Sequence, residues 1–184
     1  MASEVSICNL SLTAIGASPI TALTDAAAEA VVCRAHYEVA RDATLFEYPW
    51  PEAVGRASLA MLAAGPAYKY AYAYALPADC LRVLAIDDDR TDWKVEGQTL
   101  VTNNSTVYVR YIKKLTDPNA FGPALLSAIA ARLAAEVVMP LTGSRSLFAD
   151  MWKVYDAKLR MAQSATGMQG SGDAILADSL LVVR

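Results

Sequence analysis

The residues best suited to chemistry in this chain are few and scattered. The single histidine, His36, has no second histidine to join it in a metal site, and nothing in the sequence supplies the partners of a catalytic triad. The serines lie in no GxSxG motif, and no GxxxxGK[ST] phosphate loop occurs. Cys8, Cys33 and Cys80 are widely spaced, which favours buried free thiols over a disulfide framework or a zinc site. We therefore expect no catalytic residues, no metal ligands and no cofactor, and the sequence does not predict an enzyme.

The acidic run DDDRTD, Asp87 to Asp92, has the spacing of a calcium loop only at its start. Asp87 and Asp89 fit the first and third positions, but Asp92 falls where a glycine is required and Gln98 where a bidentate glutamate is required. A hydrolase of cell-wall sugars would need a carboxylate pair around a cleft, whereas these acids crowd one segment. The run is therefore interpreted as a solvated turn.

Four tyrosines recur at every second position in the stretch YKYAYAYA. On a β-strand, Tyr68, Tyr70, Tyr72 and Tyr74 would share one face, with the intervening alanines on the other. Such a face can be covered by the rest of the protein, contact another protein chain, or stack nucleic-acid bases. Lys69 is the only basic residue close by, so contact with protein is favoured, and a nucleic-acid-binding module using Tyr68–Tyr74 is the alternative.

The composition indicates one domain with more apolar surface than a monomer needs. Of the 184 residues, 55% are hydrophobic and 19% are charged, which favours association with copies of the chain or with a partner. The net charge of −3 argues against tight wrapping of nucleic acid. The N-terminus lacks the pattern of a signal peptide, and the most apolar run, Ala124–Met139, contains two charges and is shorter than the ~20 residues of a membrane span. We expect a soluble protein made in the cytoplasm, with no membrane contact.

Helical periodicity opens the chain. A first helix is expected to begin at Ser3 and to end near Gly16. Thr24 or Asp25 can cap a longer helix that ends at Tyr48-Pro49. The inward face of this second helix is predicted to comprise Val32, Ala35, Val39, Ala43 and Phe46.

The middle of the chain is predicted to be β-structure. The segment PWPEAVGRASLAML is expected to be partly helical, and period-two patterns follow it. Besides the tyrosine segment, strands are predicted near Leu81–Ile86, Trp93–Val95, Thr99–Val101 and Val107–Ile112. Turns at Gly97-Gln98 and Asn103–Ser105 would join them into one small antiparallel sheet of local hairpins.

Two further helices are predicted after Asp117. The first has two apolar stripes, which place it centrally in a bundle, and should end at Met139-Pro140. Ser144 is expected to cap the second, whose inward residues are Phe148, Met151, Trp152, Tyr155, Leu159 and Ala162. The fold class is thus mainly α with a β insertion: a bundle of about four helices (1–66 and 113–166), a β-hairpin insertion (67–112), and a flexible linker with an extended C-terminal arm (167–184).

Several motifs occur in an order that resembles a known family. They are ICNLSLTAIGASPITAL, RDATLFEYPWPEAVGRASLA, YAYALPADCLRVLAI, VEGQTLVTN and YIKKLTDPNAFGPALLSAIAARLAAEVVMPLTGS. This series resembles the tail tubular protein A family, the head-to-tail adaptors of short-tailed bacteriophages and prophages. The resemblance runs from about Ile7 to Leu159.

The resemblance implies a structural virion protein of the phage neck. Family members form a twelve-fold ring below the portal protein, carry the tail nozzle or tube, and let the genome pass through the centre, with transient contact between channel and DNA. The bundle would build the ring wall, and the β insertion would face neighbours and tail proteins. From composition and position we infer that the apolar arm docks on the portal through Ile175, Leu176, Leu180, Leu181, Val182, Val183 and Arg184.

Overall fold

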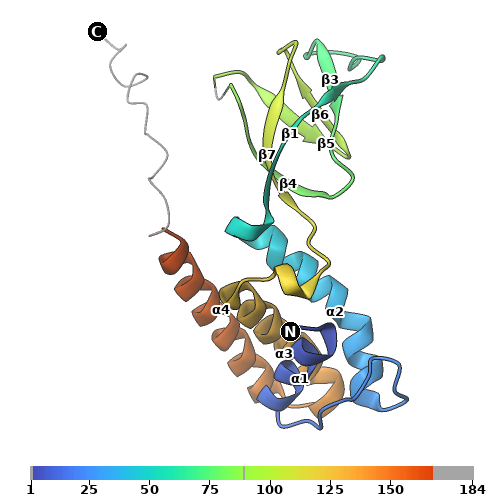
Figure 1. Ribbon diagram of the computed structural model, residues 1–184, viewed down its shortest axis with the longest axis vertical. Helices are drawn as coiled ribbons and strands as arrows, with labels where there is room; N and C mark the ends of the chain where they lie inside the picture. Colours follow the sequence, from blue (N-terminus) through green and yellow to red (C-terminus); the bar gives the residue numbers. More distant parts are fainter. Residues whose placement is uncertain (1, 89, 168–184) are drawn as a thin grey trace.

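The computed structural model describes residues 2–88 and 90–167 of the chain. In this part it has four α-helices, which form a bundle, and two antiparallel sheets, which lie together at one end of the bundle (Figure 1). This arrangement confirms the predicted fold class, a mainly helical bundle interrupted by β-structure. The predicted linker and arm lie outside the described residues, apart from Gly167 at the end of the last helix.

Helix α1 (Glu4–Ala14) begins and ends where the sequence predicts. The side chain of Ser3 accepts a hydrogen bond from the Ser6 amide at 3.1 Å, and the side chain of Ser6 accepts one from the Ser3 amide at 2.9 Å. This reciprocal cap satisfies two amides that have no partner inside the helix. Gly16, with a φ of 75°, then turns the chain away.

Helix α2 (Ala28–Glu47) begins later than predicted, and neither Thr24 nor Asp25 caps it. The Asp25 carboxylate instead accepts hydrogen bonds from the amides of Thr21 and Ala22 and from the Thr21 hydroxyl, at 2.8–3.1 Å. An aspartate that binds amides before it in the chain shapes the preceding loop and cannot also cap the helix. The predicted end at Tyr48-Pro49 is confirmed.

Helix α3 (Pro123–Thr142) is the central helix of the bundle, as predicted, and packs against α1, α2 and α4 (Arg145–Gly167). Both ends differ from the prediction. Asp117 caps only the short 3₁₀ helix Pro118–Ala120, so α3 begins later, at Pro123. At the other end Pro140 lies inside the last turn, and Gly143, with a φ of 65°, terminates the helix. Ser144 caps α4 as expected, accepting a hydrogen bond from the Leu147 amide at 3.3 Å.

Helix α3 is also long and apolar enough to cross a membrane. It has 20 residues, and its most apolar 18-residue window has a mean hydropathy of 1.7. More than half of that window, 56%, is buried inside the structure. The core helix of a soluble bundle has the same length and composition, so this feature alone indicates no location.

The strands form two sheets instead of the single predicted sheet. One has the order β1-β7-β4 and contains β1 (Val54–Ser58), β7 (Tyr108–Lys113) and β4 (Cys80–Ile86). The other has the order β2-β3-β6-β5 and contains β2 (Ala60–Met61), β3 (Tyr72–Ala75), β6 (Thr99–Thr102) and β5 (Trp93–Glu96). The Gly97-Gln98 hairpin is confirmed, with Gly97 at a φ of 63°. The predicted Asn103–Ser105 hairpin is wrong, because that segment leads from one sheet into the other.

The β-structure begins earlier than predicted, inside the segment expected to be partly helical. Only a 3₁₀ turn, Pro51–Ala53, is helical there, and β1 follows it directly. The chain then continues through Leu59, whose amide donates to the Val107 carbonyl at 3.0 Å, into β2. One extended segment thus contributes to both sheets. The sequence VGRAS is rich in small residues, so it lacks the clear alternation of apolar and polar side chains that identifies a strand.

The described residues form two large hydrophobic cores and one small cluster of Tyr70, Ala73 and Val101. The larger core fills the bundle, and most of its residues come from the four helices. The smaller joins residues of both sheets: Leu59, Tyr74, Ile86, Leu100, Val107, Val109 and Tyr111. Trp50 lies at the junction between α2 and β1, is 1% exposed, and donates from Nε1 to the Thr44 carbonyl at 2.8 Å. This tryptophan ties the start of the β-structure to the end of α2.

Candidate interaction surfaces

The four tyrosines of the predicted ladder do not share one face, and this prediction is wrong. Only Tyr72 and Tyr74 lie in strand β3. Lys69 has a φ of 73°, a left-handed conformation that breaks the extended chain between Tyr68 and Tyr70. Regular alternation therefore starts only at Tyr72.

The tyrosines consequently have four different environments. Tyr74 is 1% exposed in the core between the sheets, where its hydroxyl donates to the Asn104 carbonyl at 2.7 Å, and Tyr72 packs at the edge of that core. Tyr70 is buried with Ala73 and Val101, which lie on the other face of β3 and β6. Tyr68 is 82% exposed. A stacking platform of four tyrosines is therefore absent from the described structure.

The predicted inward face of α2 is also wrong, because most of it is exposed. Val39 is 62% and Phe46 is 51% exposed, and Ala35 is exposed as well. With Ala28 and Val31 they fall within about 80° of the helix circumference, at 100° per residue, an arc that also contains the paired carboxylate of Asp42. We call these five residues, Ala28, Val31, Ala35, Val39 and Phe46, the α2 stripe. An apolar stripe along a helix that faces solvent is typical of a protein contact.

The buried face of α2 is more polar than the α2 stripe. It includes Cys33, Tyr37, Arg41 and Thr44. Arg41 is 1% exposed, and its Nε lies 2.8 Å from the Asp42 carboxylate, which also receives Lys114 Nζ at 2.9 Å. Although burial opposes ionisation, these two cations lower the pKa of Asp42. The ion pair with Asp42 and the contact with the Tyr37 ring, 5.9 Å away, offset part of the cost of burying Arg41, whose Nη2 has no hydrogen-bond partner among the described residues.

A polar network joins the helices α2, α3 and α4. Arg132 of α3 binds Glu136 at 3.0 Å and Glu47 of α2 at 2.9 Å, and its guanidinium lies 5.6 Å from the ring centre of Trp152. Tyr155 of α4 donates to the same Glu47 carboxylate at 2.6 Å. The charges are paired and hydrogen-bonded, so the network holds the three helices in register with one another.

His36 lies at the edge of this network. Its Nδ1 is 3.9 Å from the Glu136 carboxylate, and its side chain is 41% exposed. No group of three or more His, Cys, Asp or Glu side chains in the described chain could hold a metal ion. His36 thus has one acidic neighbour and none of the further ligands that a metal centre needs.

The network makes a prediction for alkaline pH. Burial and the hydrogen bond to Glu47 raise the pKa of Tyr155 to about 12. An unfolded tyrosine ionises near pH 10, so between about pH 10 and 12 the unfolded chain loses a proton that the folded chain keeps. The stabilisation from this raised pKa, roughly 2–3 kcal/mol, is complete below pH 10 and should be lost as the pH rises. Urea unfolding at stepped pH should show a shallower decline for Tyr155→Phe, whereas Tyr68→Phe should follow the unsubstituted protein. Parallel curves for all three would contradict the role of Tyr155.

The acidic run forms an ordered turn in its described part. Asp88 accepts hydrogen bonds from the Thr91 hydroxyl at 2.6 Å, from the Arg90 amide at 3.1 Å and from the Asn104 side chain at 3.4 Å. The bond to Thr91 and the amide bond lower the pKa of Asp88. Asp88 thus closes a loop of the chain, which agrees with the interpretation as a turn.

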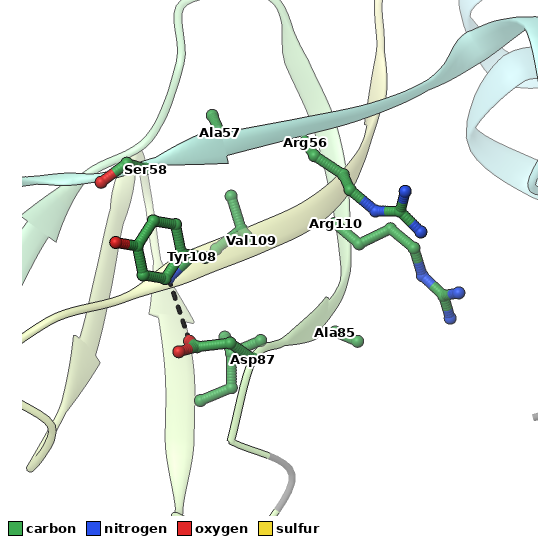
Figure 2. A pocket seen from close by; sticks show the side chains of 9 residues that line it. Arg56, Ala57, Ser58, Ala85, Asp87, Tyr108, Val109 and Arg110 are labelled. Carbon is green, nitrogen blue, oxygen red and sulfur yellow. Dashed lines mark hydrogen bonds between the residues drawn. The ribbon is translucent and has the colours of Figure 1, made fainter. Parts of the chain in front are cut away.

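A groove of about 650 Å³ lies on the sheet β1-β7-β4, and sequence reasoning missed it. Arg56 of β1 and Arg110 of β7 are cross-strand neighbours there, and Figure 2 shows their guanidinium groups extending in the same direction. Tyr108, 54% exposed, stands farther along the groove, where its amide donates to Asp87 at 3.0 Å. The signal in the sequence was the alternation of YVRYIK, which sets Arg110 on the face opposite the core between the sheets, whereas β1 with Arg56 gave no clear alternation.

The predicted portal-docking residues, Ile175 to Arg184, lie outside the described residues. The described chain therefore defines a class by its architecture: a four-helix bundle with a two-sheet β-region inserted between α2 and α3. No protein-family model matches the chain, and no curated protein matches its sequence significantly.

Proposed function

We propose that this chain is a structural virion protein, the head-to-tail adaptor of a bacteriophage or prophage. In this proposal a ring of copies, twelve by the family resemblance, sits between the portal protein and the tail nozzle or tube, and the genome passes through its centre. The chain acts as an assembly part and not as an enzyme, needs no cofactor and contacts no membrane. It is made in the host cytoplasm and resides in the virion.

The observation that carries the proposal is the α2 stripe. Its five residues run along a helix of 20 residues, and three of them, Val31, Val39 and Phe46, are 44–62% exposed. A closed ring needs two different complementary patches on each subunit, because each copy contacts its neighbours head to tail. The α2 stripe supplies one such patch on the bundle. The motif order described above supports the same role.

The shape of the molecule supports an adaptor with two ends. Figure 1 shows the bundle at one end of the long axis and the sheets at the other. Hydrogen bonds and packing at the junction, including Trp50 and the bond from the Gly122 amide to Glu52 at 2.9 Å, hold the two parts together. In the proposed ring the bundle forms the wall, the β-region faces the tail, and the C-terminal arm reaches the portal.

The arm assignment is tested by removing residues 174–184. The shortened chain should keep its circular dichroism spectrum and melting temperature, because the described bundle contains none of these residues. It should no longer co-sediment with the portal protein encoded beside it, since the arm supplies the apolar contact. A control chain that keeps the arm but carries Gln163→Ala, an exposed change on α4, should bind normally. Undiminished binding by the shortened chain would refute the arm assignment.

A further inference from the structure

The groove on the sheet β1-β7-β4 is lined by two arginines, Arg56 and Arg110, and by one carboxylate, Asp87, in an otherwise acidic protein. Arg56 lies directly opposite Arg110 across an antiparallel pair, and like charges in that position destabilise a sheet. Arg82 of β4 lies on the same face of the sheet, diagonally from Arg110. It stacks on Phe46 at 5.3 Å. The whole chain has a net charge of −3, so the three arginines on this face are a local cluster and do not reflect a basic protein.

The two arginines of the groove differ in their exposure and in their contacts within the chain. Arg110 is half-buried and engaged within the chain, which fixes its position. Arg56 is exposed, and no ion pair with a residue in 2–88 or 90–167 involves it. An anion bound by Arg56 would also be attracted by the neighbouring guanidinium group of Arg110. Planar guanidinium groups bind phosphate and carboxylate oxygens in pairs, so either anion satisfies this first condition.

The remaining walls of the groove favour a phosphate polymer. Tyr108 offers an exposed ring farther along the groove from the two guanidinium groups, and its backbone is fixed by the bond to Asp87 (Figure 2). Ala57, Ser58 and Ala85 are small and leave room for a chain to approach the sheet. A sheet surface that combines arginines with an exposed aromatic ring is the arrangement on which single strands of nucleic acid stack.

We propose that this groove binds the phosphate backbone of nucleic acid, with a phosphate between Arg56 and Arg110 and a base or sugar against Tyr108. The site is separate from the four tyrosines first considered for such a role. It involves different residues from the α2 stripe, and its test requires no ring.

The test is a fluorescence-anisotropy titration of the full chain with a labelled oligothymidylate and with a labelled duplex of equal length, at several low salt concentrations. Arg56→Gln should weaken binding about tenfold and reduce the slope of log K against log salt by about 1, the value expected for one lost phosphate contact. Lys94→Gln, which removes an exposed charge from β5 in the other sheet, is the matched control and should have a smaller effect. Thermal melts verify that each variant is folded.

Tyr108→Ala distinguishes the two forms of nucleic acid. If bases stack on this ring, the change should weaken oligothymidylate at least about fivefold and leave duplex binding unchanged. If only the backbone is held, both probes should respond to Arg56→Gln alone, which still supports the phosphate site. Equal effects of Arg56→Gln and Lys94→Gln, or no binding at the lowest salt, would overturn the proposal. Arg56-dependent binding of a polyglutamate peptide in preference to both oligonucleotides would overturn it in favour of an acidic protein partner.

Discussion

Val39→Glu is expected to abolish ring assembly while leaving the monomer folded. Val39 lies in the middle of the α2 stripe and is 62% exposed, so the change removes little from the core. Exposed substitutions of this kind alter the free energy of unfolding by about 0.5 kcal/mol or less. At a subunit contact, by contrast, the same carboxylate would be buried without a partner, which costs several kcal/mol. Because every copy in a ring carries the change, every contact is weakened.

The measurement is sedimentation velocity of the protein with the portal, using urea unfolding to verify the monomer. Val95→Glu provides the matched control, because Val95 is 43% exposed on β5 and is not part of the α2 stripe. The control should assemble as the unsubstituted protein does. Normal assembly by Val39→Glu would show that the α2 stripe is not the subunit contact.

Trp50→Ala is expected to cost about 3–5 kcal/mol of stability, the range for removing a large aromatic side chain from a core. Trp50 is 1% exposed, and its ring meets Tyr48 edge-on with ring centres 5.2 Å apart. The change also leaves the Thr44 carbonyl without its partner at 2.8 Å. A loss of this size is a large part of the 5–15 kcal/mol that stabilises a typical domain.

Urea unfolding followed by circular dichroism measures this loss without depending on tryptophan fluorescence. Trp93→Ala, at a half-buried tryptophan of β5, is the control and should cost less. The stability loss for Trp50→Phe should lie between the losses for Trp50→Ala and Trp93→Ala, because phenylalanine keeps an aromatic ring but loses the hydrogen bond. A loss below about 1 kcal/mol for Trp50→Ala would contradict its role at the junction.

The helices could be predicted from the sequence where local chemistry determines them. Ser3, Gly16 and Ser144 mark boundaries through hydrogen bonds or backbone angles that depend on neighbouring residues alone. The central position of α3 also followed from its two apolar stripes, because a helix that is apolar on both sides must be covered on both sides.

The face of α2 could not be predicted because apolar periodicity does not distinguish a core from a subunit contact. The α2 stripe was mistaken for the inward face, whereas the buried face includes Arg41, whose partner Asp42 also binds Lys114 from a distant part of the chain. The contact with Lys114 is visible only once the fold is known. The apolar periodicity of the α2 stripe thus led to the wrong prediction of a buried face, and on an exposed face it supports a protein contact.

The β-region shows a second limit of sequence reasoning. Alternation located the strands β4 to β7 but could not assign them to two sheets, because pairing depends on the long connections between them. The prediction from the tyrosine pattern failed at a single residue, Lys69. Alternation of side chains assumes an extended backbone throughout, whereas Lys69 has a left-handed backbone conformation. The groove with Arg56 and Arg110 arises from the pairing of β1 with β7, residues more than fifty positions apart in the chain.

The most direct test of the adaptor proposal is negative-stain electron microscopy of the intact protein, alone and mixed with the portal protein encoded beside it. The proposal predicts a ring of additional density on one face of the portal, with the symmetry of the ring visible in end views. Portal particles without added density, beside isolated copies of this chain, would contradict it. In that case the nucleic-acid groove, whose test is independent of the portal, would become the leading account of what the chain does.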